Sequence, residues 1–146
     1  MSSPFHNPDS PTIQNLEAAF AGESMAHIKY RYFARLCREL GDEETAKAFE
    51  ATAYQEVMHA FSHLDLLFPK SQMSPARALQ FAIDGETYEY TEMYPKFHDA
   101  AVAEGQAATE PFKAVLEKAG KRFAALAKVE LRHAAHYQTV LDTIKA

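Results

Sequence analysis

Apolar residues recur along most of this chain at the three-, four- and seven-residue spacings of amphipathic helices. The pattern predicts four helical segments, at about residues 10–39, 42–68, 74–104 and 110–143. Ser10-Pro11 and Ser74-Pro75 are pairs typical of a helix N-terminus, because serine caps free N–H groups and proline fits the first turn. Pro95 lies inside the third segment and is expected to kink it, whereas Gly120 weakens the fourth segment without ending it.

Short connections join the first segment to the second and the third to the fourth, so each pair is expected to form an antiparallel hairpin. The predicted fold is therefore all-α, a four-helix bundle built from two antiparallel hairpins, over residues 11–146. Residues 1–10 are polar and read as a flexible N-terminal lead. At 146 residues the chain is expected to form one domain.

Composition narrows the classes of function. The net charge of -5 gives no electrostatic support for nucleic-acid binding. No apolar run approaches the ~20 residues of a membrane span, and the N-terminus lacks the basic and apolar regions of a signal peptide. One cysteine, Cys37, excludes an internal disulfide and a four-cysteine metal site within one chain. We expect a cytoplasmic protein.

Two copies of one short pattern occupy the two halves. Gly22-Glu23-Ser24 is followed by a Glu-x-x-His that ends at His59, and Gly85-Glu86-Thr87 by another that ends at His133. Residues three apart share a helix face, so each Glu-x-x-His directs a carboxylate and an imidazole to one place. Two such pairs and a lone Glu from each of two other helices form the cage of a di-iron or di-manganese bundle.

The pattern predicts a role for each residue of the cage. Glu56 and Glu130, beside the histidines, are expected to bridge two metal ions. One imidazole and one terminal carboxylate would complete each position. The six predicted ligands are Glu23, Glu56, His59, Glu86, Glu130 and His133. Four carboxylates balance two ferrous ions, and oxygen ligands with two imidazoles suit iron or manganese; zinc would also fit but has no redox chemistry.

Glu89 adds a fifth carboxylate on the face of Glu86, where the first half of the chain has Ala26. It would give one metal ion a choice of ligand. Glu92 lies one turn further on but is rotated toward the rim. His27, His63 and His136 lie one turn from predicted ligands, and their roles stay open.

These motifs resemble the rubrerythrins, above all the run Gly-Glu-x-x-Glu-x-Thr-Glu-Met-Tyr-Pro at residues 85–95. The resemblance covers about residues 13–142. It implies a ferritin-like four-helix bundle and a non-haem di-iron peroxidase that reduces hydrogen peroxide as a defence against oxidative stress. In that family the carboxylate matching Glu89 is the extra ligand, which one iron exchanges for the histidine matching His59. These two residues are therefore the predicted catalytic residues.

Typical rubrerythrins add a rubredoxin domain with a four-cysteine iron, whereas this chain stops at Ala146. The predicted peroxidase would therefore take electrons from an external donor, such as rubredoxin or another reductant. The main alternative is a ferroxidase, an iron-handling protein that reacts with dioxygen. A third is a helical protein that binds metal or a partner without catalysis.

We also expect a homodimer. Apolar residues near the end of the second segment, Phe61, Leu64, Leu67 and Phe68, offer a contact surface. The loop from Pro69 to Ser74 could act as a hinge that exchanges hairpins between subunits, and dimers of both kinds occur in the family that the chain resembles.

Overall fold

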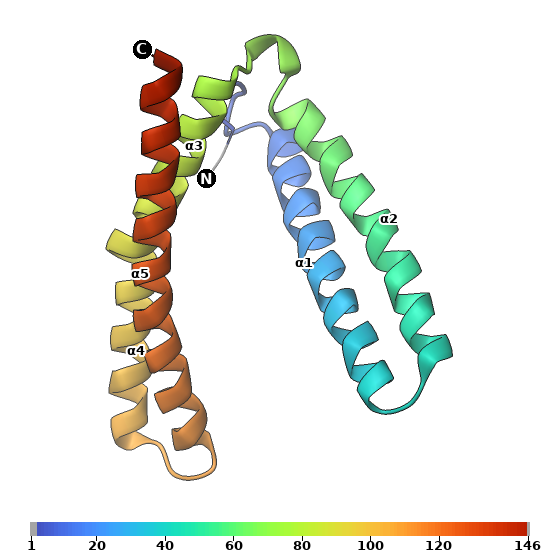
Figure 1. The fold of residues 1–146 in the computed structure, drawn as a ribbon, viewed down its shortest axis with the longest axis vertical. Coiled ribbons are helices and arrows are strands. Elements are labelled where there is room, and N and C mark those ends of the chain that lie inside the picture. The colour runs from blue at the N-terminus through green and yellow to red at the C-terminus, as the bar shows by residue number, and fades with distance from the viewer. Residues whose placement is uncertain (1–2, 146) are drawn as a thin grey trace. The chain divides into compact units, whose positions relative to one another are not determined.

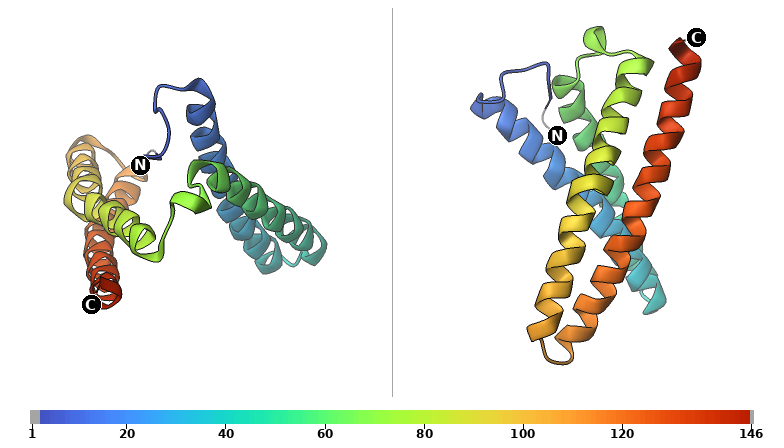
Figure 2. Two further views of the ribbon diagram at one scale, coloured as in Figure 1. Left: turned by 90° about the horizontal axis from the view of Figure 1, so that it is seen from above. Right: turned by 90° about the vertical axis from the view of Figure 1, so that its left-hand side faces the viewer.

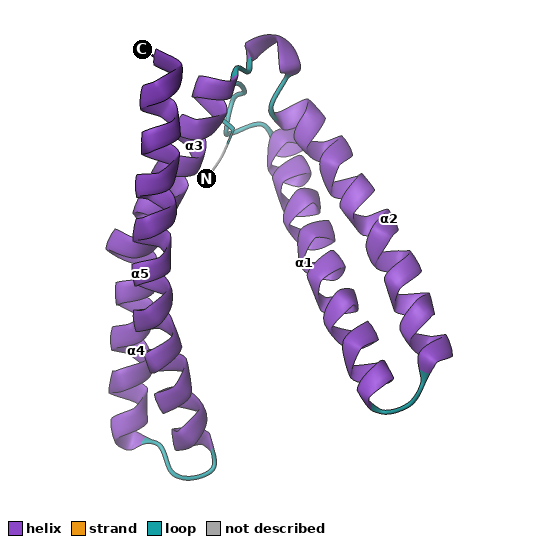
Figure 3. Ribbon diagram, in the orientation of Figure 1, coloured by secondary structure: helices purple, strands orange, loops and turns teal. Residues whose placement is uncertain are grey.

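The structure is a computed structural model that describes residues 3–145, and every regular element in that range is helical (Figure 3). The elements are α1 (Pro11–Glu39), α2 (Glu43–Leu67), a 3₁₀ turn (Lys70–Gln72), α3 (Pro75–Tyr88), a π-helical turn (Glu89–Met93), α4 (Tyr94–Ala107) and α5 (Phe112–Lys145). The chain divides into two compact units, one ending at Met73 and one beginning at Ser74. Each unit is an antiparallel hairpin, α1 with α2 and α3–α4 with α5 (Figures 1 and 2). The predicted all-α class and both hairpins are confirmed.

Local signals set the helix ends close to their predicted positions. Pro11 and Pro75 occupy the first turns of α1 and α3, and the Ser74 hydroxyl accepts a hydrogen bond from the Arg77 N–H. The Asp42 carboxylate caps α2 by accepting from the Thr45 N–H at 3.0 Å. Gly41 just before it has φ of 85°, a backbone conformation that favours glycine, and it turns the chain from α1 into α2.

In the first hairpin, α1 and α2 approach closely because α2 presents small side chains to α1. Ala46, Ala53 and Ala60 recur every seven residues and are almost fully buried, and Leu67 continues the row with 2% exposure. A row with this spacing stays on one side of a helix. Aromatic side chains also join the two helices, since the ring centroids of Tyr30 in α1 and Phe49 in α2 lie 5.8 Å apart.

The second hairpin contains the main departure from regular helix. The third predicted segment widens into the π-helical turn Glu89–Met93, in which the Tyr94 N–H donates to the Glu89 carbonyl five residues back. Pro95 has no N–H for the carbonyl four residues before it, and the Thr91 hydroxyl donates to the Thr87 carbonyl at 2.7 Å. Both features loosen the regular ladder of hydrogen bonds. The irregularity predicted from Pro95 is present, as an expanded turn.

The N-terminal lead contacts the end of the first hairpin. The Ser3 hydroxyl donates to the Leu67 carbonyl, and a ring nitrogen of His6 lies 2.8 Å from the Leu66 carbonyl. Phe5 packs edge-on against Phe68. Ser3 and His6 thus contact carbonyls at the C-terminus of α2 that have no hydrogen-bond partner within the helix.

These contacts correct one part of the predicted dimer surface. Leu67 is buried within its own hairpin, Phe68 packs against Phe5, and Leu64 is half-buried. Only Phe61 of that set is strongly exposed, at 55%. The α2 C-terminus is thus partly covered by the chain itself, while Leu66 stays 58% exposed. None of the helices between residues 3 and 145 is both long and apolar enough to span a membrane.

Candidate metal centre

The first hairpin brings three predicted ligands together. Glu23 of α1 and Glu56 and His59 of α2 each offer an atom, and these atoms lie within 4.8 Å of one another. The His59 Nδ1 atom is 3.1 Å from a Glu56 carboxylate oxygen and 3.9 Å from one of Glu23. A hydrogen bond with Glu56 raises the pKa of Glu23, and burial and the Glu56 charge act in the same direction. The two carboxyl groups therefore lie close enough for each negative charge to disfavour the other.

The second hairpin repeats this arrangement with Glu86 of α3 and Glu130 and His133 of α5, again within 4.8 Å. The His133 Nδ1 atom is 2.8 Å from a Glu130 oxygen and 3.5 Å from one of Glu86. Glu130 is 8% exposed, which is rare for a carboxylate unless it is paired. In both hairpins Nδ1 faces the carboxylates, so it is the nitrogen placed to bind a metal ion.

Glu89 is half-buried at the start of the π-helical turn, close to the second group. Burial raises the pKa of its carboxyl, and the charges of Glu86 and Glu130 raise it further. Burial is also the main cause of the raised pKa of Tyr94, with contributions from Glu89, Glu130 and Glu86. Tyr94 is thus placed beside the carboxylates, as a candidate hydrogen-bond donor to them. Glu92, in contrast, is exposed.

The π-helical turn explains how Glu89 fits into an otherwise repeated pattern. In the first half Tyr30 follows Glu23 by seven residues and packs on Phe49. In the second half Tyr94 follows Glu86 by eight residues and packs on Phe123, with ring centroids 6.1 Å apart. A π-helical turn absorbs one extra residue. Two features of the sequence indicate this turn, namely the extra residue between Glu86 and Tyr94 and the presence of Pro95. They do not show at which residue the turn begins.

The remaining histidines take different positions. His27 lies between α1 and α2, and its Nδ1 atom is 2.7 Å from the Ala53 carbonyl. Because that nitrogen must donate to the carbonyl, the other ring nitrogen of His27 is left as an acceptor. His63 is half-buried, and its charge acts on Glu23. His136 is exposed beside Tyr137.

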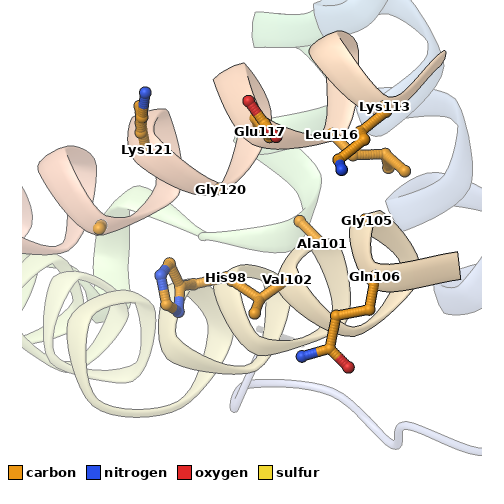
Figure 4. Close-up of a pocket in the computed structure, with 11 residues that line it drawn as sticks. His98, Ala101, Val102, Gly105, Gln106, Lys113, Leu116, Glu117, Gly120 and Lys121 are labelled. Atoms are coloured by element: carbon orange, nitrogen blue, oxygen red, sulfur yellow. The ribbon is translucent and has the colours of Figure 1, made fainter. Parts of the chain in front are cut away.

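A pocket of about 460 Å³ lies elsewhere, between α4 and α5 (Figure 4). His98 and Val102 of α4 and Leu116 and Gly120 of α5 are among its lining residues. The helices meet closely there, since a Cβ on Gly120 would lie 3.7 Å from that of Ala101. None of the seven predicted site residues lines it. The predicted metal ligands therefore lie outside this cavity, in the two carboxylate–histidine groups.

Two such groups in an all-α chain, each offering two carboxylates and an imidazole, are the arrangement found in helical proteins that hold two metal ions with carboxylates and histidines. The family model for rubrerythrin matches residues 14–141, and this chain is a member of that family. The predicted resemblance and the ferritin-like class are thereby confirmed.

Individual relatives agree with this membership. The chain is 36% identical to rubrerythrin of Porphyromonas gingivalis, covering 93% of this chain and 68% of the relative. It is 33% identical to rubrerythrin of Nitratidesulfovibrio vulgaris, covering 93% and 72%. Identity to nigerythrin of the same organism is 39%, over 64% of this chain and about half, 52%, of the relative. A solved structure of nigerythrin in a mixed-valence state aligns with a TM-score of 0.42 and 32% identity, over 100% of this chain and 73% of that one.

Proposed function

We propose that this protein is a non-haem di-iron peroxidase that reduces hydrogen peroxide to water with electrons from an external donor. The observation that supports this most directly is that each hairpin holds an equivalent carboxylate–imidazole group, and that the second hairpin adds a half-buried carboxylate, Glu89, beside its group. Six ligands are sufficient to hold two metal ions. A seventh group in the same place is the feature by which this site differs from a simple iron-binding site.

The residues fit two ferrous ions. Each group offers two carboxylate oxygens and one imidazole nitrogen, a donor set that suits iron or manganese. The raised pKa of Glu23 beside the Glu56 charge is what a carboxylate pair shows when no cation lies between its members. Two divalent ions would supply four charges to the four carboxylates. We propose that the two groups together hold both ions, with Glu56 and Glu130 as bridging ligands, Glu23 and Glu86 as terminal ligands, and His59 and His133 on separate ions.

Bound iron would supply the two electrons that convert one hydrogen peroxide and two protons into two waters. The protein would position the reactants and manage protons around that step. Glu89 and His59 would be alternative ligands for one position, an anionic oxygen and a neutral nitrogen. The Tyr94 phenol stays protonated at neutral pH, since its pKa is raised, and can donate a hydrogen bond to a carboxylate or to peroxide. Apolar rings such as Phe123 would limit the entry of water.

Rapid mixing of the ferrous-loaded protein with its oxidant tests this proposal. Reduced protein should react much faster with hydrogen peroxide than with dioxygen, and each protein with two iron ions should consume one peroxide. Faster reaction with dioxygen would favour the alternative, a ferroxidase. No spectral change with either oxidant, in protein shown to hold iron, would indicate metal binding without catalysis.

We propose that the electron donor is a separate protein such as rubredoxin, or another small reductant, because these 146 residues hold one cysteine, Cys37, and do not themselves form a four-cysteine iron site. Steady-state turnover with peroxide should require an added donor. Turnover at an undiminished rate without any added reductant would contradict this part of the proposal.

A further inference from the structure

His27 forms a hydrogen bond between the two helices of the first hairpin, next to the first carboxylate–histidine group. Its Nδ1 atom lies 2.7 Å from the Ala53 carbonyl oxygen, and the residue is half-buried. A carbonyl only accepts, so Nδ1 carries the proton and donates. On α1, His27 follows Glu23 by four residues, about one turn. On α2, Ala53 precedes Glu56 by three residues. The bond therefore joins the two helices about one turn away from both carboxylates.

Close helix packing makes this bond possible. Ala53 belongs to the buried alanine row and is 2% exposed. Its methyl group lets α1 approach, so the imidazole of His27 reaches the backbone of α2. In a regular helix the same carbonyl accepts from the N–H four residues later, which belongs to Val57 of α2. His27 is thus a second donor to this carbonyl, and its removal leaves no buried acceptor without a partner.

The two carboxylates need a bond of this kind because they repel each other. A hydrogen bond with Glu56 and burial raise the pKa of Glu23, and the Glu56 charge raises it further. With no cation between them, the like charges tend to push α1 and α2 apart. A neutral hydrogen bond one turn away opposes that separation and keeps the ligand atoms of the group within 4.8 Å of one another. Ligands held in place before the ion arrives bind it more tightly, because less order has to be created on binding.

The second hairpin has no histidine in the matching place. Tyr90 occupies the position four residues after Glu86, and it lies in the π-helical turn. On α5, Ala127 precedes Glu130 by three residues, so the small residue of the first hairpin is repeated. The imidazole donor on the partner helix is not. Any effect of this donor should therefore be confined to the first group.

We propose that His27 is a positioning residue for the metal ligands of the first hairpin. By donating to the Ala53 carbonyl, it holds Glu23 of α1 in register with the two ligands of α2. The first position thereby binds its ion more tightly, and the second position is unaffected. This inference rests on the proposed function in one respect, that the first group binds a metal ion, and not on the reaction that follows.

Replacing His27 with and without a hydrogen-bond donor tests the proposal. His27→Phe keeps a ring but has no donor, and it should weaken the binding of one ferrous ion about tenfold, as the loss of a supporting hydrogen bond around a metal site does. His27→Asn should restore most of that affinity, because its amide nitrogen is attached to Cγ, as Nδ1 is in the imidazole. A histidine that only fills space would give the opposite order, since phenylalanine fills the space better than the smaller asparagine. The apo forms of both variants should melt close to the wild type, because no buried acceptor loses its last partner.

His136→Phe is the matched control. It makes the same substitution three residues after the ligand His133, but at an exposed position. Both ions should bind to this variant as they do to the wild type. A loss confined to His27→Phe therefore shows that the bond to α2 matters, and not the mere presence of a histidine near a ligand.

Two backgrounds identify the affected position. With Glu86 and His133 replaced by alanine, the first hairpin keeps its ligands, and His27→Phe should weaken the remaining ion. With Glu23 and His59 replaced instead, the remaining ion should bind equally well with and without His27→Phe.

Anaerobic calorimetric titration with ferrous iron measures these affinities. A wild type that fails to bind two ions would overturn the proposed metal centre and this inference with it. A wild type that binds two ions, together with unweakened binding in His27→Phe, would overturn the role of His27 alone. Equal weakening in His27→Phe and His27→Asn would do the same, because the donor would then not be the cause.

Discussion

Glu130 is the residue whose replacement tests the metal centre most sharply. It is the most buried of the predicted ligands, 8% exposed, and it lies 2.8 Å from His133. Its charge also contributes to the raised pKa values of Glu89 and Tyr94. If Glu130 bridges two ions, Glu130→Ala should abolish binding at both positions. If it binds only one ion, one position should survive.

The expected size of the effect follows from linkage. A ligand present at 100 times its dissociation constant stabilises the folded state by about 2.7 kcal/mol, so two such ions contribute about 5 kcal/mol. For a chain of about this length, 1 kcal/mol shifts the melting temperature by roughly 2–4 °C. Ferrous iron should therefore raise the melting temperature of the wild type by about 10–20 °C. Glu130→Ala should lose that whole increase.

The assay is anaerobic thermal unfolding with and without ferrous iron, together with metal analysis of the same samples. Comparing the iron-dependent increase, not the melting temperature itself, removes any effect of the substitution on the apo protein. Glu92→Ala is the matched control, since Glu92 is an exposed carboxylate in the π-helical turn and should keep two ions and the full increase. Two ions per chain and an undiminished increase in Glu130→Ala would refute the assignment of this ligand.

Three further predictions follow from particular contacts. Glu89→Ala should still load two iron ions but react more slowly with peroxide, whereas Glu92→Ala should be near normal; stopped-flow rates in the opposite order would show that the extra ligand is Glu92. Leu67→Ala should lower the free energy of unfolding by about 2–5 kcal/mol in denaturant titrations, because Leu67 is 2% exposed; a loss below about 1 kcal/mol would contradict its burial. The hydrogen bond from the Thr45 N–H lowers the pKa of Asp42 in the folded state, so the cap stabilises the fold above the unfolded-state pKa, and this contribution is lost as pH falls through the lower folded-state pKa. Asp42→Asn should remove this acid dependence of the free energy of unfolding. An unchanged dependence of stability on pH would argue against the cap.

Helix boundaries and the ligand pairs within one helix were predictable because they depend on local geometry. A serine followed by proline starts a helix at Ser10 and at Ser74 whatever packs against it later. Glu130 and His133 share a face because they are three residues apart in one helix. Glu92 lies six residues after Glu86, about 120° away from it on a regular helix, whereas Glu89 lies only three residues after it, and the structure leaves Glu92 exposed and Glu89 half-buried.

Tertiary structure decided the features that join segments distant in the chain. Glu23 and Glu56 come within hydrogen-bonding distance because the alanine row lets α1 and α2 approach, and the helical period does not report that distance. Leu67 was predicted to be part of an exposed surface, yet it is buried, and Ser3 of the N-terminal lead bonds its carbonyl. An apolar residue in a helix has the same local pattern whether its own chain or a second copy covers it. Only the packed hairpin distinguishes these two cases, because burial is a property of what surrounds a residue and periodicity is a property of the helix alone.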